Sequence, residues 1–326
     1  MRMGLSMRRF VGAAVAGCLV VASATAADWP GSGTVRILVP FGPGSTPDII
    51  ARVLADQFSQ TLAANFVIEN KPGASGNIGT DAVAKAKPDG TTLGLSIPGP
   101  LAINSLLFKT MPYDLFRDFK LISMVATQPS VLAVNASLGV DSVSTLVEHI
   151  RREPDKFSFG SIGTGSLSHL AMEAIALKSS VHLVHVPYAS SPQAVTALVR
   201  GDVQMACLPA ISVVPLAKSG SLKVLAVTTA QPSPLLPEVA TLKASGIDVD
   251  AAAWTGLVAP AHTPDTVINA INHEVVAALS VPAVRNKLAQ QMMEPIGSTP
   301  AEFKAAIEAE IARWAPIIKA ANIHID

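Results

Sequence analysis

Apolar residues occur in short runs that alternate with amphipathic stretches along most of the chain. In the first third, the runs at 35–39, 66–69 and 92–97 are rich in β-branched and apolar residues. Helical patterns cover 47–62 and 79–85 between them. Strands that alternate with helices of this length form βαβ units, so the pattern predicts a parallel sheet with helices on its faces.

The same rhythm restarts after residue 118. Strands are expected at 131–134, 157–160, 184–186 and 203–208, with helices at 144–152, 167–178 and 192–200. Further elements complete the chain, namely strands at 222–228 and 254–258 and helices at 263–279, 282–291 and 299–320. Neither a repeat nor a Pro/Gly/Ser-rich linker separates the two parts. The sequence therefore predicts two α/β units, with discontinuous domains joined by strands.

The last helix carries the clearest local signals. Thr299 is a suitable N-cap, Pro300 fits the first turn, and Glu302 completes a capping box. Apolar residues at helical spacing follow, among them Trp314, which we expect to be a core anchor. Pro316 predicts a kink or an end, unless a new turn begins after it.

The N-terminus has the pattern of a secretory signal peptide. Basic residues, the last of them Arg8 and Arg9, precede an uncharged run over 10–26 that ends in Ala24-Thr25-Ala26. This predicts a signal peptide of residues 1–26, cleavage near Ala26 and an exported mature protein. Two alternatives remain: acylation of Cys18 as a lipoprotein, and twin-arginine export through Arg8-Arg9.

Charge and cysteine content narrow the class. The chain has 24 Lys+Arg and 24 Asp+Glu, which excludes a basic nucleic-acid footprint. We expect no nucleic-acid partner and a monomeric protein. Cys207 is the only cysteine of the predicted mature chain, so no internal disulfide can form, and its apolar strand-like surroundings predict a core residue.

Candidate chemistry lies in four turns that are rich in Gly, Ser and Thr and follow predicted strands. The first covers 40–48, where Thr46 is the expected N-cap and Pro47 the first helical residue. Free N–H groups at a helix N-terminus favour a carboxylate. The alternative interpretation is that Gly42 and Gly44 only form a tight turn.

The other three turns cover 70–80, 160–170 and 186–192. The turn at 160–170 combines three glycines with four hydroxyl residues before a helix, which is typical of an anion-binding nest. Nests on both α/β units predict a cleft between them. In the last turn, Tyr188 is either a pocket wall or a packed turn residue.

Catalytic and metal-binding interpretations find little support. The motifs G-x-S-x-G, G-x-G-x-x-G, G-x-x-x-x-G-K-[ST] and H-E-x-x-H are absent from the sequence. His182 and His185 are expected on opposite faces of a strand, and His169 is expected to bond a neighbouring loop rather than act as a base. Asp48 is expected to stabilise a helix N-terminus electrostatically. We therefore expect a protein that is not an enzyme and needs no cofactor or metal.

The turns in this order resemble a known family. The segments Pro40-Phe41-Gly42-Pro43-Gly44-Ser45-Thr46-Pro47-Asp48, Glu69-Asn70-Lys71-Pro72-Gly73-Ala74-Ser75-Gly76, Gly163-Thr164-Gly165-Ser166, His185-Val186-Pro187-Tyr188 and Trp254-Thr255-Gly256-Leu257 are similar to those of the Bug, or TctC-type, solute receptors of tripartite tricarboxylate transporters. The resemblance extends from about residue 34 to the last helix.

The resemblance implies a type II-like periplasmic-binding-protein fold. Two α/β lobes, one of residues 27–125 plus 228–326 and the other of residues 126–227, would be joined by two crossing strands near 121–126 and 222–228 and would close around a solute. It also implies capture of a small carboxylate, such as a di- or tricarboxylate, an amino acid or an aromatic acid. Delivery to membrane permease subunits would follow.

Carried over by position, the resemblance assigns ligand binding to these residues: Phe41, Gly44, Ser45, Thr46, Asp48, Ala74, Ser75, Gly163, Thr164, Gly165, Ser166, His169, Tyr188 and Ser190. Three departures from the family pattern, at Ser45, Ala189 and His262, predict a distinct specificity. A receptor that signals to a sensor protein, and a small-molecule enzyme on the same scaffold, are the alternative functions.

Overall fold

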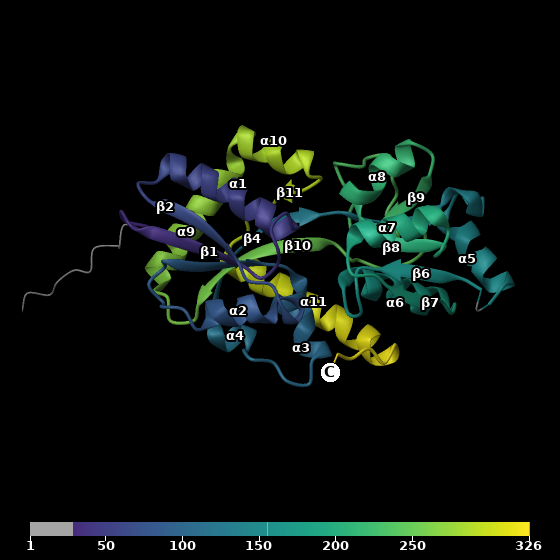
Figure 1. The fold of residues 1–326 in the computed structure, drawn as a ribbon, viewed down its shortest axis with the longest axis horizontal. Coiled ribbons are helices and arrows are strands. Elements are labelled where there is room, and N and C mark those ends of the chain that lie inside the picture. The colour runs from purple at the N-terminus through teal and green to yellow at the C-terminus, as the bar shows by residue number, and fades with distance from the viewer. Residues whose placement is uncertain (1–28, 155, 326) are drawn as a thin grey trace, which may run out of the picture.

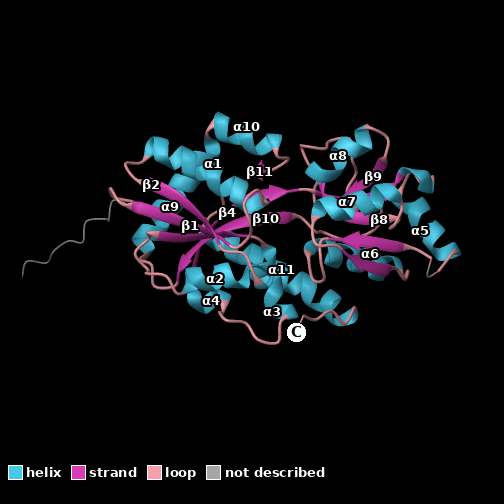
Figure 2. Cartoon of the chain, viewed as in Figure 1, coloured by secondary structure: helices cyan, strands magenta, loops and turns pink. Residues whose placement is uncertain are grey.

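The computed structural model describes residues 29–154 and 156–325. The predicted signal peptide, with Cys18 and the cleavage site at Ala26, lies outside the described residues. Two α/β units lie side by side along the long axis of the molecule (Figure 1). Each unit consists of a sheet with helices on both faces (Figure 2).

The first unit is built on a six-stranded sheet in the order β11-β4-β10-β3-β1-β2. Its strands are β1 (Thr34–Val39), β2 (Asn65–Asn70), β3 (Thr92–Ser96), β4 (Phe119–Gln128), β10 (Ala253–Pro260) and β11 (Glu294–Pro295). Strand β1 is parallel to β2 and β3, as the βαβ pattern predicts. Strand β10 is antiparallel to both β3 and β4, so the sheet is mixed.

Helices cover both faces of the first sheet. They are α1 (Thr46–Thr61), α2 (Asn77–Ala84), α3 (Asn104–Leu107), α4 (Leu115–Asp118), α9 (Asp265–Ser280), α10 (Pro282–Gln290) and α11 (Pro300–Ala320). One hydrophobic cluster joins the sheet to α1, α9 and α10. Helices α2, α3 and α11 pack on the opposite face in a second cluster.

The second unit has a five-stranded sheet in the order β7-β6-β8-β5-β9. Its elements are β5 (Ser130–Asn135), α5 (Val143–Arg152), β6 (Ser158–Ser161), α6 (Leu167–Ser179), β7 (Val184–Pro187), α7 (Ser191–Arg200), β8 (Met205–Pro209), α8 (Ala210–Lys218) and β9 (Leu222–Val227). The sequence pattern did not predict α8, because Pro215 lies inside this helix and interrupts the helical pattern.

Two segments connect the units. Strand β4 passes into β5 through Pro129 alone, and the chain returns from β9 to β10 through residues 228–252. Thr228 is anchored at this return, because its hydroxyl lies 2.9 Å from the carbonyl oxygen of Ala251 and its N–H donates to the carbonyl of Ser130. The connecting segment also packs on the second sheet, where Thr241 bridges to Val227.

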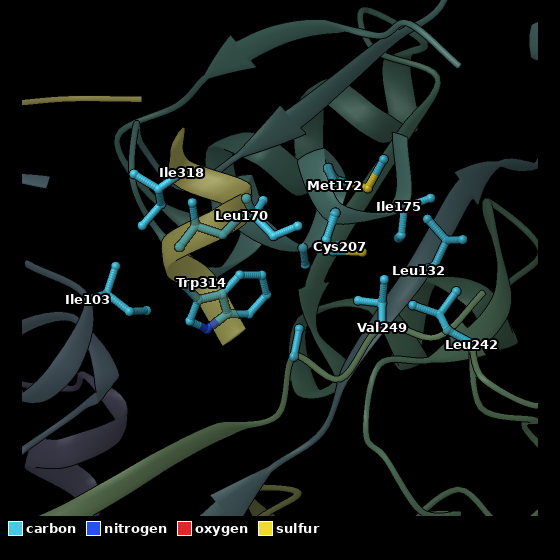
Figure 3. Packing of buried hydrophobic residues seen from close by; sticks show 14 of the residues in the cluster. Ile103, Leu132, Leu170, Met172, Ile175, Cys207, Leu242, Val249, Trp314 and Ile318 are labelled. Atoms are coloured by element: carbon cyan, nitrogen blue, oxygen red, sulfur yellow. The ribbon is translucent and has the colours of Figure 1, made fainter. Parts of the chain in front are cut away.

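The C-terminal helix α11 ties the two units together. It packs against β4 in the first unit and against α6 in the second. Trp314 is buried in a cluster that also contains Leu132, Leu170 and Cys207 from the second unit (Figure 3). The predictions of a core Trp314 and a core Cys207 are confirmed.

The local signals at the ends of α11 are partly confirmed. Thr299 and Glu302 form both hydrogen bonds of the capping box. The helix continues through Pro316 to Ala320, so the proline does not end it. Within this helix, Trp314 donates its indole N–H to the buried Glu310 carboxylate at 2.6 Å, so both buried polar groups are satisfied.

Among the described residues, no single helix is long and apolar enough to cross a membrane. The pair α9 and α10, bent by 74°, meets the test of length and composition only when both are taken together. Helix α9 contributes Ile271 and Val275 to the core of the first unit, and helix α10 contributes Leu288.

Candidate ligand-binding site

The four predicted turns lie at the edges where the two sheets face each other. Because β4 leads directly into β5, the carboxyl end of β4 meets the amino end of β5. Strand pairing then places the carboxyl ends of β1, β2 and β3 on the first edge and those of β6, β7 and β8 on the second. Ligands of open α/β sheets bind at such carboxyl ends.

Asp48 organises the first turn. Its side chain is 2% exposed and accepts hydrogen bonds from the Gly44 N–H at 2.8 Å and from Asn70 Nδ2 at 3.0 Å. Arg52 adds Nε at 3.0 Å and Nη2 at 2.9 Å. Burial alone would raise the pKa of Asp48, but these hydrogen bonds hold it below its ordinary value. The carboxylate is thus satisfied within the protein and shapes the turn.

Helix α1 begins one residue earlier than the sequence predicts. Ser45, not Thr46, is the N-cap, because its backbone is extended (φ −70°, ψ 158°) and its carbonyl accepts the Ile49 N–H. Pro47 is consequently the second helical residue. In the described structure, the N–H groups of Thr46 and Asp48 have no protein acceptor, as is usual in a first turn.

Two hydroxyl groups of the first turn differ in their surroundings. Thr46 Oγ1 lies 3.3 Å from Gln128 Oε1, at the point where β4 crosses to the second unit. Ser45 Oγ is buried and has no partner among the described residues. Buried hydroxyls are normally hydrogen-bonded, so Ser45 is available to a ligand or to water.

The second turn has positive φ angles at four consecutive residues. The φ angles are 133° at Gly73, 46° at Ala74, 53° at Ser75 and 91° at Gly76. Two of these residues carry a Cβ, and each left-handed non-glycine residue costs about 1–2 kcal/mol. Within the described residues the N–H groups of Ala74 and Ser75 make no hydrogen bond. The strained turn therefore presents two unpaired donors.

The first and second turns contact each other. Asn70 Nδ2 donates to the carbonyl of Phe41 at 2.9 Å. The Phe41 ring lies against Gly76, where a Cβ would come within 2.9 Å of its Cζ atom. The predicted site residues of the first unit therefore form one surface.

The third turn is closed by its own hydrogen bonds. The Ser166 hydroxyl donates to the Gly163 carbonyl at 2.6 Å and caps α6 by accepting the His169 N–H. Gly163 and Gly165 have φ angles of 119° and 75°, which glycine adopts without strain. In the described structure, this leaves the N–H groups of Thr164, Leu167 and Ser168 as the donors without a protein acceptor.

Two stacked histidines support this turn. The rings of His169 and His185 lie 3.7 Å apart at an interplanar angle of 10°. His169 Nδ1 accepts the Gly165 N–H at 3.1 Å, and His185 Nε2 lies 2.7 Å from Ser161 Oγ. His169 forms a hydrogen bond with a neighbouring loop, as predicted. Through these contacts both rings support the third turn.

The fourth turn contributes a ring and a helix N-terminus. The Tyr188 N–H donates to the Ser161 carbonyl at 2.9 Å, which joins this turn to the third. The Tyr188 ring packs against Gly160 and is half-buried. Ser190 is the N-cap of α7, and its side chain makes no capping bond.

The electrostatics of the facing edges come mainly from backbone dipoles. Three helices of at least ten residues, α1, α6 and α7, begin at these edges and point their positive ends between the units. The four turns themselves contain no arginine, and the adjacent Arg52 is paired with Asp48. Within the described residues, no three His, Cys, Asp or Glu side chains are grouped so as to hold a metal. The arrangement suits an anion held by neutral donors.

Tertiary structure adds residues that the sequence reading did not select. Gln128 contacts Thr46 and donates Nε2 to the Gln291 carbonyl at 3.2 Å. Asn104 donates to the Ser75 carbonyl at 3.1 Å. For Gln128, the only sequence signal was its position next to a predicted crossing strand. No sequence signal pointed to Asn104. Asp48, His169 and Ser166 were predicted to bind the ligand, but their side-chain polar groups are engaged within the protein.

The fold and the facing turns define a two-lobed solute-binding protein. Residues 50–323 match the family described as Tripartite tricarboxylate transporter family receptor, and the chain belongs to this family. BugT of Bordetella pertussis is 33% identical over 301 residues, which are 92% of each protein. A Pseudomonas protein of strain P51, from the tcbD-tcbE intergenic region, is 34% identical over 88% of this chain and 86% of its own length.

Solved structures agree with this assignment. R. palustris Rpa4515 with adipate is 35% identical, has a TM-score of 0.80, and is matched over 91% of this chain and 99% of its own. MatC from Rhodopseudomonas palustris with bound malate is 27% identical with a TM-score of 0.75, over 88% and 99% of the two chains. The prediction of a Bug or TctC-type receptor with a periplasmic-binding-protein fold is confirmed.

Proposed function

We propose that this protein captures a small carboxylate between its two lobes and delivers it to the membrane permease subunits of a tripartite transporter. The observation that carries the proposal is the set of unpaired N–H groups at the facing edges. Thr46, Ala74 and Ser75 supply them on the first unit, and Thr164 and Leu167 on the second. Charge-assisted hydrogen bonds to such donors can hold a carboxylate without an arginine.

In this proposal, the first lobe consists of residues 27–125 and 228–326, and the second lobe consists of residues 126–227. Sheet membership supports this division except at residues 126–128, which belong to β4 of the first sheet. Solute enters between the lobes, and closure occurs by rotation about the connection at Pro129 and the return segment near Thr228. Helix α11 limits this rotation, because it packs on both lobes.

The predicted site residues have two roles in this proposal. Ser45, Thr46, Ala74, Ser75, Thr164 and Ser190 contact the solute through donors that have no other use. Tyr188 forms a wall of the pocket, and Phe41 supports the first turn. Gly44, Asp48, Gly163, Gly165, Ser166 and His169 give the turns their shape, because the N–H groups of the glycines and the side chains of the other three are bonded internally.

The similar proteins with bound adipate and malate support a small dicarboxylate as the ligand class. Both molecules carry two carboxylates and no positive charge. In this protein, the donors on each lobe form a separate group, so one carboxylate can bind to each. The departures at Ser45 and Ala189 lie beside these donors and are the expected determinants of specificity.

We further propose that the mature protein acts in the periplasm as a monomer without catalytic activity, after cleavage near Ala26. The similar proteins are solute receptors, which supports this assignment. It requires neither a metal nor a cofactor.

The test is a binding experiment on residues 27–326 purified without added ligand. Native mass spectrometry reveals a co-purified acid, and thermal shift compares adipate and malate with neutral diamides of the same length. A carboxylate at 100 times its Kd adds about 2.7 kcal/mol to the free energy of unfolding. We expect a shift with an acid and none with its diamide. The absence of a shift with any mono-, di- or tricarboxylate or acidic amino acid contradicts the proposal.

A further inference from the structure

A buried polar network lies behind the left-handed second turn. Asn104, at the start of α3, is 3% exposed. Its Nδ2 atom lies 3.1 Å from the carbonyl oxygen of Ser75 and 2.6 Å from Oδ1 of Asn77. One amide group therefore contacts both the strained turn and the first residue of α2.

Tyr113 extends the network on its other side. Its hydroxyl lies 2.9 Å from Asn77 Oδ1 and 2.8 Å from the carbonyl oxygen of Pro100. Its ring packs edge-on against Phe119 with centroids 5.5 Å apart. Burial raises the pKa of Tyr113, so the hydroxyl remains a donor. Asn77, Asn104 and Tyr113 form a fixed support built from three separate segments of the chain.

We propose that Asn104, held by Asn77 and Tyr113, is a positioning residue for ligand binding. It keeps Ala74 and Ser75 in the left-handed conformation that presents their N–H groups to the solute. This inference rests on the proposed function, since it assigns the turn to carboxylate binding. Asn104 acts through the Ser75 carbonyl and does not itself contact the ligand.

The physical reason is the conformational preference of residues that carry a Cβ. A serine released from its hydrogen bond favours the right-handed or extended basin, because the left-handed one brings Cβ close to the next carbonyl. In that basin the Ser75 N–H points elsewhere. Glycine has no such preference and needs less support. Replacing Ser75 by glycine therefore distinguishes the positioning role of Asn104 from ordinary core packing, because only the positioning role depends on the residue at position 75.

The experiment is a double-mutant cycle with Asn104→Ala, Ser75→Gly and their combination. The matched control is Asn135→Ala, because Asn135 is also buried and also donates to main-chain carbonyls, those of Leu198 and Val199. Asn135 lies at the end of β5 that points away from the first unit. Tyr113→Phe removes only the hydroxyl and serves as a milder second variant.

The first readout needs no ligand. Amide hydrogen exchange is measured at Gly76 and Asn77, whose N–H groups close the turn onto the carbonyls of Gly73 and Ala74. We expect Asn104→Ala to accelerate exchange of both amides about tenfold in the wild-type background. In the Ser75→Gly background, the same substitution should accelerate it less than threefold. Asn135→Ala should leave both rates unchanged. Equal acceleration by Asn104→Ala in the two backgrounds overturns the proposal.

The second readout is the Kd for adipate, or for whichever acid stabilises the wild-type protein. We expect Asn104→Ala to weaken binding about tenfold and Tyr113→Phe to weaken it less, with a loss under threefold in the Ser75→Gly background. An unchanged Kd for Asn104→Ala contradicts the positioning role. A wild-type protein that binds no acid contradicts the proposed function instead, and the exchange measurement alone then decides the conformational claim.

Discussion

The second and third turns lie at the facing ends of the two sheets and both carry unpaired backbone N–H groups, but they are constructed differently. The second turn forces Ala74 and Ser75 to positive φ angles and is supported by buried amide and phenol groups. The third turn places glycines, Gly163 and Gly165, at its positive φ angles and is supported by the stacked rings of His169 and His185. One turn stores strain and the other avoids it.

This difference predicts how each turn responds to change. The support of the second turn does not titrate at physiological pH, so its shape depends on packing and steric fit. The support of the third turn includes the His185 imidazole, whose Nε2 lies 2.7 Å from Ser161 Oγ, so the shape of this turn depends on the protonation of that ring. The third turn should therefore be sensitive to acid, whereas the second turn should not.

The largest effect is expected from adding a methyl group to the second turn. In Gly76→Ala, the new Cβ would lie 2.5 Å from Pro100 Cγ at a φ of 91°. Overpacking and left-handed strain together should cost about 3 kcal/mol. Gly163→Ala meets nothing within 4 Å and should cost about 1–2 kcal/mol from strain alone. Urea denaturation measures both, and equal costs would remove the distinction between the turns.

A smaller loss is expected when the charge of Asp48 is removed. Asp48→Asn keeps the shape but weakens the bonds to Arg52 and the Gly44 N–H, which should cost about 2 kcal/mol. The pKa of Asp48 is lowered on folding, so its contribution is present above the ordinary Asp pKa and disappears as the pH falls through the folded value.

Asp56→Asn is the control for this comparison. Its pair with Lys287 is exposed on both sides, at 63% and 52%, and its loss should change the free energy of unfolding by less than about 1 kcal/mol. Urea denaturation at pH 7 separates the two variants. Similar small losses in both would show that Asp48 does not organise the first turn.

The third turn should weaken in acid. Burial and the proximity of His169 lower the pKa of His185 to about 4, while Glu173 acts in the opposite direction. Unfolded histidine titrates near 6.5, so stability is complete above that pH and falls as the pH drops toward 4. His185→Gln should lose part of this dependence, as judged by Tm at several pH values, whereas the exposed His262→Gln should not. Parallel curves for His185→Gln and wild type argue against the assignment.

The smallest effect on stability is expected at Ser45. Its hydroxyl has no protein partner and its φ of −70° is unstrained, so Ser45→Ala should change the free energy of unfolding by less than about 0.5 kcal/mol. Its effect should appear in carboxylate affinity, which isothermal titration measures. A large loss of stability with unchanged affinity would assign Ser45 to the fold rather than to the ligand.

By itself, the sequence determined the features that depend on near neighbours in the chain. The alternation of strands and helices, the capping box at Thr299 and Glu302, and the four turns after strands all follow from side-chain periodicity and from Gly, Ser and Pro chemistry. Family resemblance then supplied the two-lobed architecture. Even here, the start that the sequence predicted for α1 differs by one residue from the observed start, because Ser45 and Thr46 are both good N-caps.

Only the tertiary structure decided which donors remain free and what holds them. The stack of His169 on His185, the contact of Asn104 with Ser75 and the engagement of Asp48 by Asn70 join residues that are distant in the chain or placed by other elements. Such contacts depend on strand order and packing, which no local periodicity encodes. The turns could thus be located from sequence, but their strain, their supports and their unpaired N–H groups follow from the packing of the two sheets.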